Sequence, residues 1–114
     1  MKELIEYFVQ NLERKKHIFE LINHIKLVLT IENDQENCAI VFNDGSVFME
    51  PSHLRIEDTT KVIIHGNTDA ISSLLDGRLK LREGVLKDQL QVAGSFRNKL
   101  LLESVFYLAG KSKF

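Results

Sequence analysis

The sequence predicts an α+β fold in which an antiparallel sheet of five strands is covered on one side by helices. Apolar residues recur three and four apart near both ends of the chain, which indicates helices. Between them lie short alternating or apolar runs separated by turn residues, which indicate strands. The 114 residues suffice for one hydrophobic core and contain no linker or repeat, so we expect residues 1–114 to form a single domain.

The N-terminal segment, from Lys2 to about Asn23, has the apolar spacing of a helix. Its apolar residues fall into two sets, Leu4, Ile5, Phe8, Val9 and Leu12 and then Ile18, Phe19, Leu21 and Ile22. The charged run at residues 13–17 interrupts the apolar stripe between the sets. The segment is therefore either two helices that meet at this run or one helix with a hydrated middle.

Three strands follow in close succession. Apolar residues occupy alternate positions in residues 25–32, as a strand with one buried face requires, and residues 38–42 form a second apolar run. Residues 43–45, Asn-Asp-Gly, tolerate positive φ in a tight turn, so residues 46–50 return as a third strand. These short connections predict an antiparallel meander, which Pro51 ends or places at a sheet edge.

The second half of the chain alternates between strands and helices. The predicted elements are a strand at 61–65, a helix from a cap at Asn67 or Thr68 to Gly77, a short helix at 79–87 interrupted at Gly84, a strand at 90–93 and a helix at 96–109 capped by Ser95. Side-chain oxygens of Asn, Thr and Ser accept hydrogen bonds from the free amides at a helix start, and glycine commonly ends a helix. The turn and cap residues therefore divide this half into five elements.

The composition excludes several classes of protein. Fifteen basic and sixteen acidic residues give a formal net charge of -1, so we expect no nucleic-acid partner. Cys38 is the only cysteine, which excludes an intrachain disulfide and a zinc site built on several thiolates, and fits a reducing compartment. No apolar run has the length of a signal-peptide core or a membrane span. We therefore expect a soluble, cytoplasmic protein without integral membrane association.

Motifs of known catalytic and metal sites are not found in the sequence. No His or Cys pair has zinc-finger or HExxH spacing, and no nucleophile elbow, phosphate loop or dinucleotide fingerprint occurs. Cys38 begins a predicted strand, so a buried structural thiol is favoured over a nucleophile. We therefore predict that the chain is not an enzyme and that it uses no metal and no cofactor.

The predicted terminal helix carries more apolar residues than one buried stripe needs. Between Leu100 and Ala109 only Glu103 and Ser104 are strongly polar. The surplus predicts a second contact surface for this helix, which is additional core, a partner chain or a ligand cavity. The sequence leaves these three alternatives open.

The second half of the chain has a distinctive order of strands, helix ends and glycines. It consists of Lys61-Val62-Ile63-Ile64-His65, the helix end Leu74-Leu75-Asp76-Gly77, a short helix to Lys87, the run Leu90-Gln91-Val92-Ala93-Gly94-Ser95 and the apolar terminal helix. This order resembles the sterol carrier protein type 2 family, in particular its bacterial-type, stand-alone members, over residues 25–110. The resemblance implies a five-stranded, mostly antiparallel sheet whose covering helices enclose a hydrophobic tunnel.

The resemblance further implies non-catalytic binding or transfer of a small apolar ligand in this tunnel, namely a fatty acid, a fatty acyl-CoA or a sterol-like molecule. The residues expected to line it are those that point inward on strands or lie on helices facing the sheet: Phe42, Val47, Met49, Leu75, Leu79, Leu81, Leu101, Val105 and Leu108. Burial of an acyl chain contributes roughly 0.8 kcal/mol per methylene before the costs of ordering are subtracted. Apolar side chains alone could therefore hold such a ligand.

Two other functions remain open at this stage. The apolar terminal helix could instead make the chain a homodimer or another protein–protein interaction module. A small enzyme acting on acyl thioesters is the second alternative, and it would need a base such as His65 and an acidic residue in one cleft.

Overall fold

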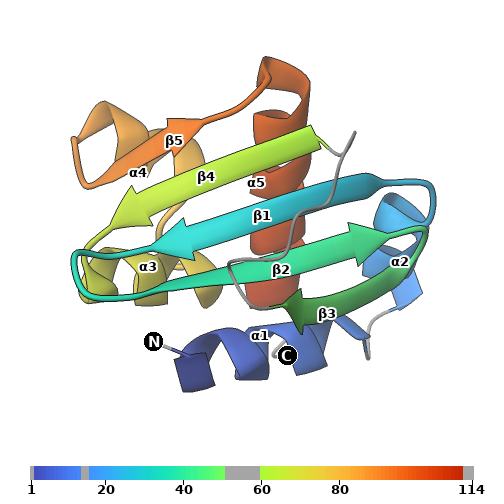
Figure 1. The fold of residues 1–114 in the computed structure, drawn as a ribbon. Helices are drawn as coiled ribbons and strands as arrows, with labels where there is room; N and C mark the ends of the chain where they lie inside the picture. Colours follow the sequence, from blue (N-terminus) through green and yellow to red (C-terminus); the bar gives the residue numbers. More distant parts are fainter. Residues whose placement is uncertain (1, 14–15, 51–59, 112–114) are drawn as a thin grey trace.

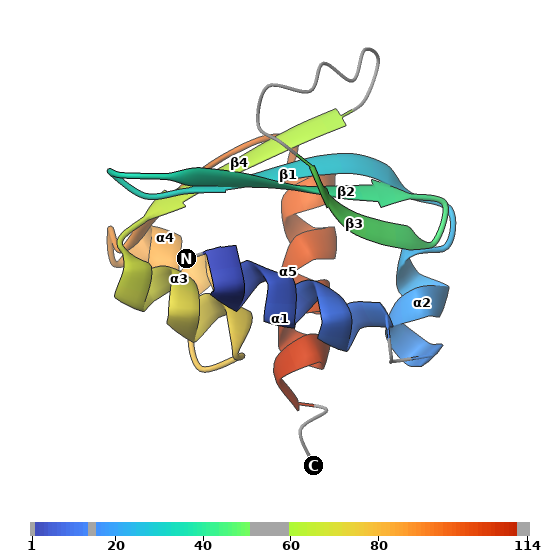
Figure 2. The ribbon, with the colours of Figure 1, turned by 60° about the horizontal axis from the view of Figure 1, so that its bottom comes forward.

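The chain forms one mixed sheet, and the described helices lie together on one face of it (Figures 1 and 2). The structure is a computed structural model that describes residues 2–13, 16–50 and 60–111. The strands are β1 (Lys26–Glu32), β2 (Asn37–Asn43), β3 (Ser46–Glu50), β4 (Thr60–Gly66) and β5 (Leu90–Ala93). The helices are α1 (Lys2–Glu13), α2 (Lys16–Ile22), α3 (Thr68–Leu75), α4 (Leu81–Leu86) and α5 (Phe96–Lys111). The predicted α+β class is confirmed.

The sheet has the strand order β3-β2-β1-β4-β5. The first three strands form the predicted antiparallel meander, in which the backbone of Leu29 lies opposite Ile40. β4 then pairs with β1 in parallel, so that Leu29 is also opposite Val62, and β5 closes the other edge antiparallel to β4. The sheet is therefore mostly antiparallel, with the parallel pair at its centre. Pro51, predicted to end the third strand, lies outside the described residues.

The N-terminal segment forms two helices, as one of the two predicted alternatives requires. α1 ends at Glu13 and α2 begins at Lys16, within the charged run that interrupts the apolar stripe. Ile5, Phe8 and Leu12 of α1 are buried, because residues three and four apart share a helix face. This face packs below the sheet beside α5, in the arrangement seen in Figure 2.

The predicted caps of α3 and α5 are present. The Oδ1 atom of Asn67 accepts a hydrogen bond from the backbone N–H of Ala70 at 2.8 Å, so Asn67 rather than Thr68 is the cap of α3. The Oγ atom of Ser95 accepts a hydrogen bond from the N–H of Asn98 at 3.2 Å. Both bonds satisfy amides that have no partner within the helix.

The short helix differs from the prediction at its start and at its glycine. α4 begins at Leu81 rather than Leu79, and it continues through Gly84, whose N–H donates to the carbonyl of Lys80 at 3.0 Å. A Cβ atom on Gly84 would lie 2.5 Å from the Cδ1 atom of Leu90. The predicted interruption is therefore wrong, because Gly84 serves close packing of α4 on β5 rather than a break in the helix.

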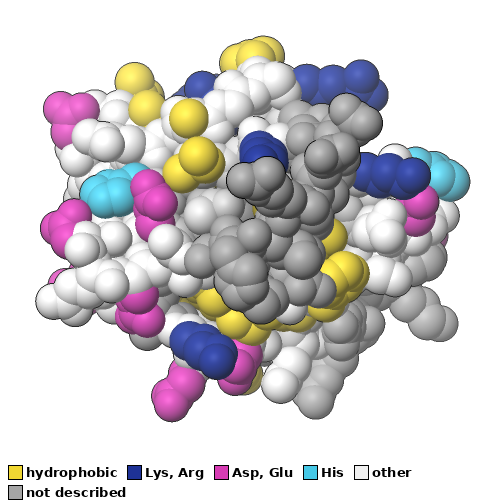
Figure 3. All heavy atoms as spheres, in the orientation of Figure 1, with side chains coloured by type: hydrophobic (Ala, Val, Ile, Leu, Met, Phe, Trp, Pro, Cys, Tyr) yellow, Lys and Arg dark blue, Asp and Glu magenta, His cyan; other side chains and the backbone are white. Residues whose placement is uncertain are grey.

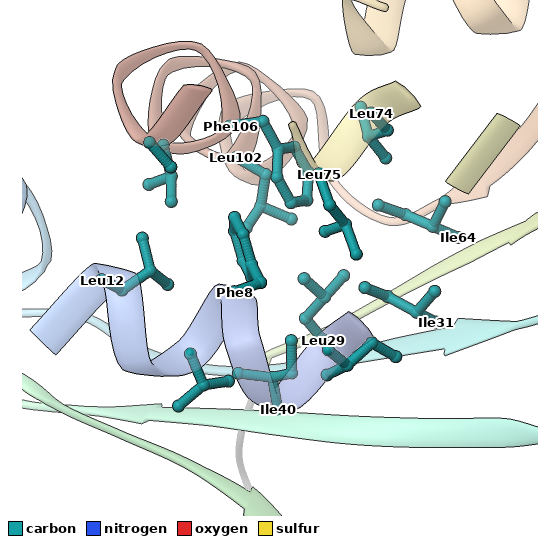
Figure 4. Packing of buried hydrophobic residues seen from close by; sticks show 14 of the residues in the cluster. Phe8, Leu12, Leu29, Ile31, Ile40, Ile64, Leu74, Leu75, Leu102 and Phe106 are labelled. Carbon is teal, nitrogen blue, oxygen red and sulfur yellow. The ribbon is translucent and has the colours of Figure 1, made fainter. Parts of the chain in front are cut away.

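The hydrophobic core fills the space between the sheet and the helices. Figure 4 shows side chains from α1, α3, α5 and the strands meeting there, with Phe8 beside Phe106. The centroids of these two rings are 5.4 Å apart, which is a favourable distance for an aromatic pair. On the opposite face of the sheet, the described residues form a small buried cluster of Val28, Ala39 and Val41. Within the described ranges, no helix combines the length and apolarity needed to cross a bilayer.

Candidate functional site

An apolar groove lies between α4, β5 and the first turns of α5. We call it the α4–α5 groove; its volume is about 170 Å³ and its surface is almost wholly apolar. The apolar lining consists of Leu81, Val85, Leu86, Val92, Phe96 and Leu100, and the charged residues at its rim are Arg82, Lys99 and Glu103. Its composition, an apolar concavity with a few polar groups at the edge, is that of a small-molecule site, and its volume is smaller than the roughly 300–1,000 Å³ of a drug-sized pocket.

The local sequence explains why this groove forms. The glycine at position 84 lets α4 approach Leu90 of β5, and the chain then turns at Gly94, whose φ of 153° favours glycine. Leu81 and Val85 are four residues apart on α4, and Phe96 and Leu100 are four apart on α5, so each pair shares one helix face. The two apolar faces border the same groove.

The apolar side chains of the groove range from buried to largely exposed. Leu81 is buried, whereas 76% of Leu86 and 75% of Phe96 are exposed to solvent. In Figure 3, exposed hydrophobic side chains occur along the upper part of the molecule, where β5 and the start of α5 lie, and Lys and Arg side chains flank them. Large apolar side chains that gather at one place on the surface are common at ligand-binding grooves and interaction sites, which makes this groove a candidate.

An ion pair at the rim separates the groove from a second, more polar hollow. The Nη2 atom of Arg82 on α4 lies 3.3 Å from the Oε2 atom of Glu103 on α5. The adjoining hollow of about 670 Å³ shares Arg82, Leu100 and Glu103 with the groove, and its other lining residues are Lys80, Glu83, Ser104 and Tyr107. The two hollows together suit an amphipathic molecule, with an apolar part on one side of the ion pair and a polar part on the other.

The nine residues predicted to line a tunnel occupy different surroundings. Phe42, Val47, Leu75, Leu81 and Val105 are buried in the core, Met49, Leu79 and Leu108 are partly buried against it, and Leu101 is half-buried. Only Leu81 of this set lines the groove, while Leu75 lines a hollow of about 150 Å³ beside α1 and Leu79 lines a polar hollow of about 380 Å³ beside α3. The set as a whole stays a prediction.

Five apolar residues of the groove were not predicted as ligand contacts. Leu100 is one of the surplus apolar residues of the terminal helix. The sequence showed that surplus but did not show which face of the helix would contact a ligand. Val85, Leu86, Val92 and Phe96 lie near glycines and caps that were interpreted only as boundaries. The signal available in the sequence was that α4 and β5, two short elements, contain more large apolar residues than they need for packing against the core.

The histidine and cysteine considered in the sequence lie away from the groove. The Nε2 atom of His65 is 3.3 Å from the Oδ1 atom of Asp34, so a base and an acid do meet, but neither residue lines the α4–α5 groove. Cys38 is buried, and this burial raises the pKa of its thiol, as expected for a structural cysteine. The described residues contain no group of three His, Cys, Asp or Glu side chains positioned for a metal ion.

Known proteins share this arrangement of elements. No protein-family model matches the chain. The SCP2 domain-containing protein YusD of Bacillus subtilis (strain 168) is 28% identical over 95 residues, which cover 82% of this chain and 81% of YusD. A solved structure, the UbiJ-SCP2 ubiquinone synthesis protein, has a TM-score of 0.71 at 15% identity and covers 96% of this chain and 89% of its own. The sterol carrier protein domain 2 of Helicoverpa armigera has a TM-score of 0.62 at 12% identity, with 96% and 86% covered. The predicted resemblance is confirmed.

Proposed function

We propose that this chain, which is similar to sterol carrier protein 2, binds or transfers a lipid without catalysing a reaction on it, and that the lipid binds first in the α4–α5 groove. The observation that carries the proposal is the row of apolar side chains from buried Leu81 to exposed Phe96, bordered by a charged rim. Transfer of a lipid needs apolar surface that the ligand can reach from outside, and this groove provides it.

The energetics of the groove favour an acyl chain with a polar head. Each methylene buried against the apolar lining contributes roughly 0.8 kcal/mol before the costs of ordering. The guanidinium of Arg82, at the junction with the polar hollow, offers hydrogen-bond donors to an anionic or polar head group. A fatty acid or a fatty acyl-CoA satisfies both requirements, whereas a sterol-like molecule would use mainly the apolar part.

Of the nine predicted lining residues, Leu81 already lines the groove, and the other eight remain in the proposal as a deeper wall. In the described structure, Phe42 and Val105 pack among other core side chains. An acyl chain would contact them only when α5 moves away from the sheet and the core opens. We likewise propose that residues 1–114 act as one lipid-binding domain whose partner is a small apolar ligand.

The proposal is tested with two matched substitutions at half-exposed apolar positions. Leu100 in the groove is 39% exposed, and Ile63, on the opposite face of the sheet, is 41% exposed. A fluorescent fatty acid is titrated into the unmodified chain, Leu100→Asp and Ile63→Asp, with thermal unfolding followed by circular dichroism as the check on folding. We expect Leu100→Asp to weaken binding about tenfold or more, as one badly placed charge does, and Ile63→Asp to leave it unchanged.

Two results would contradict the proposal. One is an equal loss of binding in both folded variants, which would place the ligand elsewhere. The other is no binding by the unmodified chain of a fatty acid, an acyl-CoA or ubiquinone, the last included because one structural neighbour is named a ubiquinone synthesis protein.

A homodimer is the second candidate function, because Leu86 and Phe96 would also suit an interface between two chains. Light scattering separates the candidates. If the groove holds lipid, we expect a monomer that binds lipid; if the groove is an interface, we expect twice the chain mass, and that mass should be lost in Leu86→Asp.

A further inference from the structure

We propose that the exposed edge of the α4–α5 groove docks on an anionic lipid bilayer. This inference rests on the proposed lipid-binding function and adds the surface from which the ligand is taken or to which it is delivered. The edge, which we call the docking edge, consists of Leu86 and Phe96 with the basic residues next to them, Lys87 and Arg97.

The apolar part of the docking edge is larger than the groove itself requires. A side chain that only lined the groove could turn most of its surface inward, yet about three quarters of Leu86 (76%) and Phe96 (75%) face solvent. Leu86 is the last residue of α4 and Phe96 the first of α5, so both project from helix ends. Such side chains can enter the boundary between lipid head groups and acyl chains without any change of fold.

Charge around the docking edge is opposite in sign to that of the whole chain. Residues 80–103 contain five basic residues, Lys80, Arg82, Lys87, Arg97 and Lys99, and three acidic ones, Glu83, Asp88 and Glu103, which gives +2. The chain carries -1, so the remainder carries -1 - 2 = -3. Arg82 and Glu103 pair with each other, and the other four basic and two acidic residues of the segment still sum to +2. An anionic bilayer would therefore attract this edge and repel the rest of the molecule.

The same charges disfavour a second copy of the chain as the occupant. A twofold interface brings the same patch of both chains together. It would set the two basic borders of the docking edge against one another, and like charges across an interface cost binding free energy. A bilayer rich in anionic lipid supplies both the apolar interior that Phe96 needs and the negative charge that Arg97 needs.

Docking at this edge would also place the groove correctly for its ligand. Leu86 and Phe96 line the groove as well as the edge, so the apolar lining continues directly into the side chains that would enter the bilayer. An acyl chain could pass between bilayer and groove along apolar surface, which avoids the cost of hydrating its methylenes.

The test uses charge reversals outside the groove lining. Lys87 and Arg97 are exposed and do not line the α4–α5 groove, so Lys87→Glu/Arg97→Glu should keep its affinity for a fluorescent fatty acid in vesicle-free solution. The matched control is Lys2→Glu/Lys26→Glu, which makes the same change of net charge at exposed positions on α1 and at the start of β1, away from β5 and the first turn of α5. All three chains are sedimented with vesicles of phosphatidylglycerol and phosphatidylcholine, and with vesicles of phosphatidylcholine alone.

We expect the unmodified chain and the control to bind the phosphatidylglycerol vesicles, and the Lys87→Glu/Arg97→Glu chain to bind them at least about tenfold more weakly. Binding should also fall when the salt concentration rises, because the charges on both surfaces are screened. Leu86→Ser/Phe96→Ser should weaken vesicle binding even at low salt, which shows that the apolar side chains take part.

The outcomes separate this inference from the function on which it rests. Fatty-acid binding without vesicle binding would overturn the docking inference and leave the lipid carrier intact. An equal loss in the control pair would move the docking surface to another face and likewise overturn it. Absence of both activities, with a dimeric mass that Phe96→Ser abolishes, would overturn both and show that the edge is a protein interface.

Discussion

Gly84 in α4 and Leu90 in β5 are packed so closely that a Cβ atom on Gly84 would lie 2.5 Å from Leu90 Cδ1 and 2.9 Å from Leu90 Cγ. Leu90 is only 2% exposed, so its side chain cannot turn away into solvent. The same side chain also packs against Gly66, because a Cβ atom on Gly66 would lie 2.7 Å from Leu90 Cδ2. Two glycines thus make room for one leucine, which joins α4 to the edge of the sheet and so sets one wall of the groove.

Gly84→Ala should therefore destabilise the protein by about 1–2 kcal/mol, because the cost of overpacking exceeds the gain of about 1 kcal/mol in helix propensity. Urea unfolding measures the change. In a Leu90→Ala background the clash is absent, so the same substitution should become neutral or stabilising. A loss of equal size in both backgrounds would show that the Gly84–Leu90 contact is not the cause.

Phe42→Ala should lower the free energy of unfolding by about 3–5 kcal/mol, since Phe42 is 1% exposed and its removal leaves a cavity in the core. Phe48→Ala on the neighbouring strand is the matched control, because Phe48 is 38% exposed and should cost far less, roughly 1 kcal/mol or below. A small effect at Phe42 would mean that this residue borders an open space, as its predicted place in a tunnel lining requires.

Arg82→Gln should weaken binding of a long-chain fatty acid while leaving binding of the corresponding fatty alcohol nearly unchanged. The guanidinium attracts a carboxylate but has little preference for a hydroxyl, and a charge-assisted hydrogen bond contributes about 1.5–3 kcal/mol. Calorimetric titration of both ligands gives the ratio. Glu103→Gln is the companion variant: it frees Arg82 from its ion pair and should strengthen binding of the acid. If Arg82→Gln weakened the acid and the alcohol alike, head-group recognition by Arg82 would be ruled out.

Asn67→Ala should destabilise the protein by about 1 kcal/mol, because the hydrogen bond from Ala70 N–H to Asn67 Oδ1 caps α3. Asn67→Asp keeps an oxygen that can accept this hydrogen bond, and the positive end of the helix dipole stabilises the carboxylate. The stability of this variant should therefore be retained. Thermal unfolding of the two variants makes the comparison. Equal losses in both would argue against a capping role.

Cys38 should react slowly with iodoacetamide at pH 8 in the folded protein and quickly after unfolding in urea. Its side chain is buried, and burial raises the pKa of the thiol, so both access and the thiolate fraction are low. A Cys38→Ala/Ser46→Cys chain provides an exposed thiol for comparison, since Ser46 is exposed on β3. Alkylation of native Cys38 as fast as that of the exposed thiol would contradict this.

The order of elements could be predicted because each has a local signal. The alternation around Leu29 and the Asn-Asp-Gly turn before Ser46 depend only on neighbours in the sequence, and so do the caps Asn67 and Ser95. The family resemblance rested on the order in which strands, helix ends and glycines follow one another in the second half of the chain, and the comparisons confirm the resemblance.

The groove could not be predicted because it depends on contacts between distant residues. Gly84 is a poor helix former by propensity, and its place inside α4 follows only from contact with Leu90. Leu81 and Leu100 share one groove because α4 and α5 meet across β5, and no periodicity within either helix contains that information. Similarly, the strong apolar character of Phe42 and Val105 predicted burial, but not whether a ligand or other side chains would fill the space around them.

The parallel pairing of β1 with β4 has a consequence for how the chain reaches its native state. Leu29 and Val62 are neighbours in space but 33 positions apart in the sequence, and β1 must await β4 before its second edge is paired. During synthesis the β1–β3 meander leaves the ribosome before β4, so the edge of β1 that will pair with β4 is still exposed. Unpaired strand edges at this stage are prone to pair with other chains. The nonlocal pairing also raises the contact order, so folding should be slower than for a meander alone. The central seam of the sheet, between β1 and β4, can therefore form only after residues 60–66 have been synthesised.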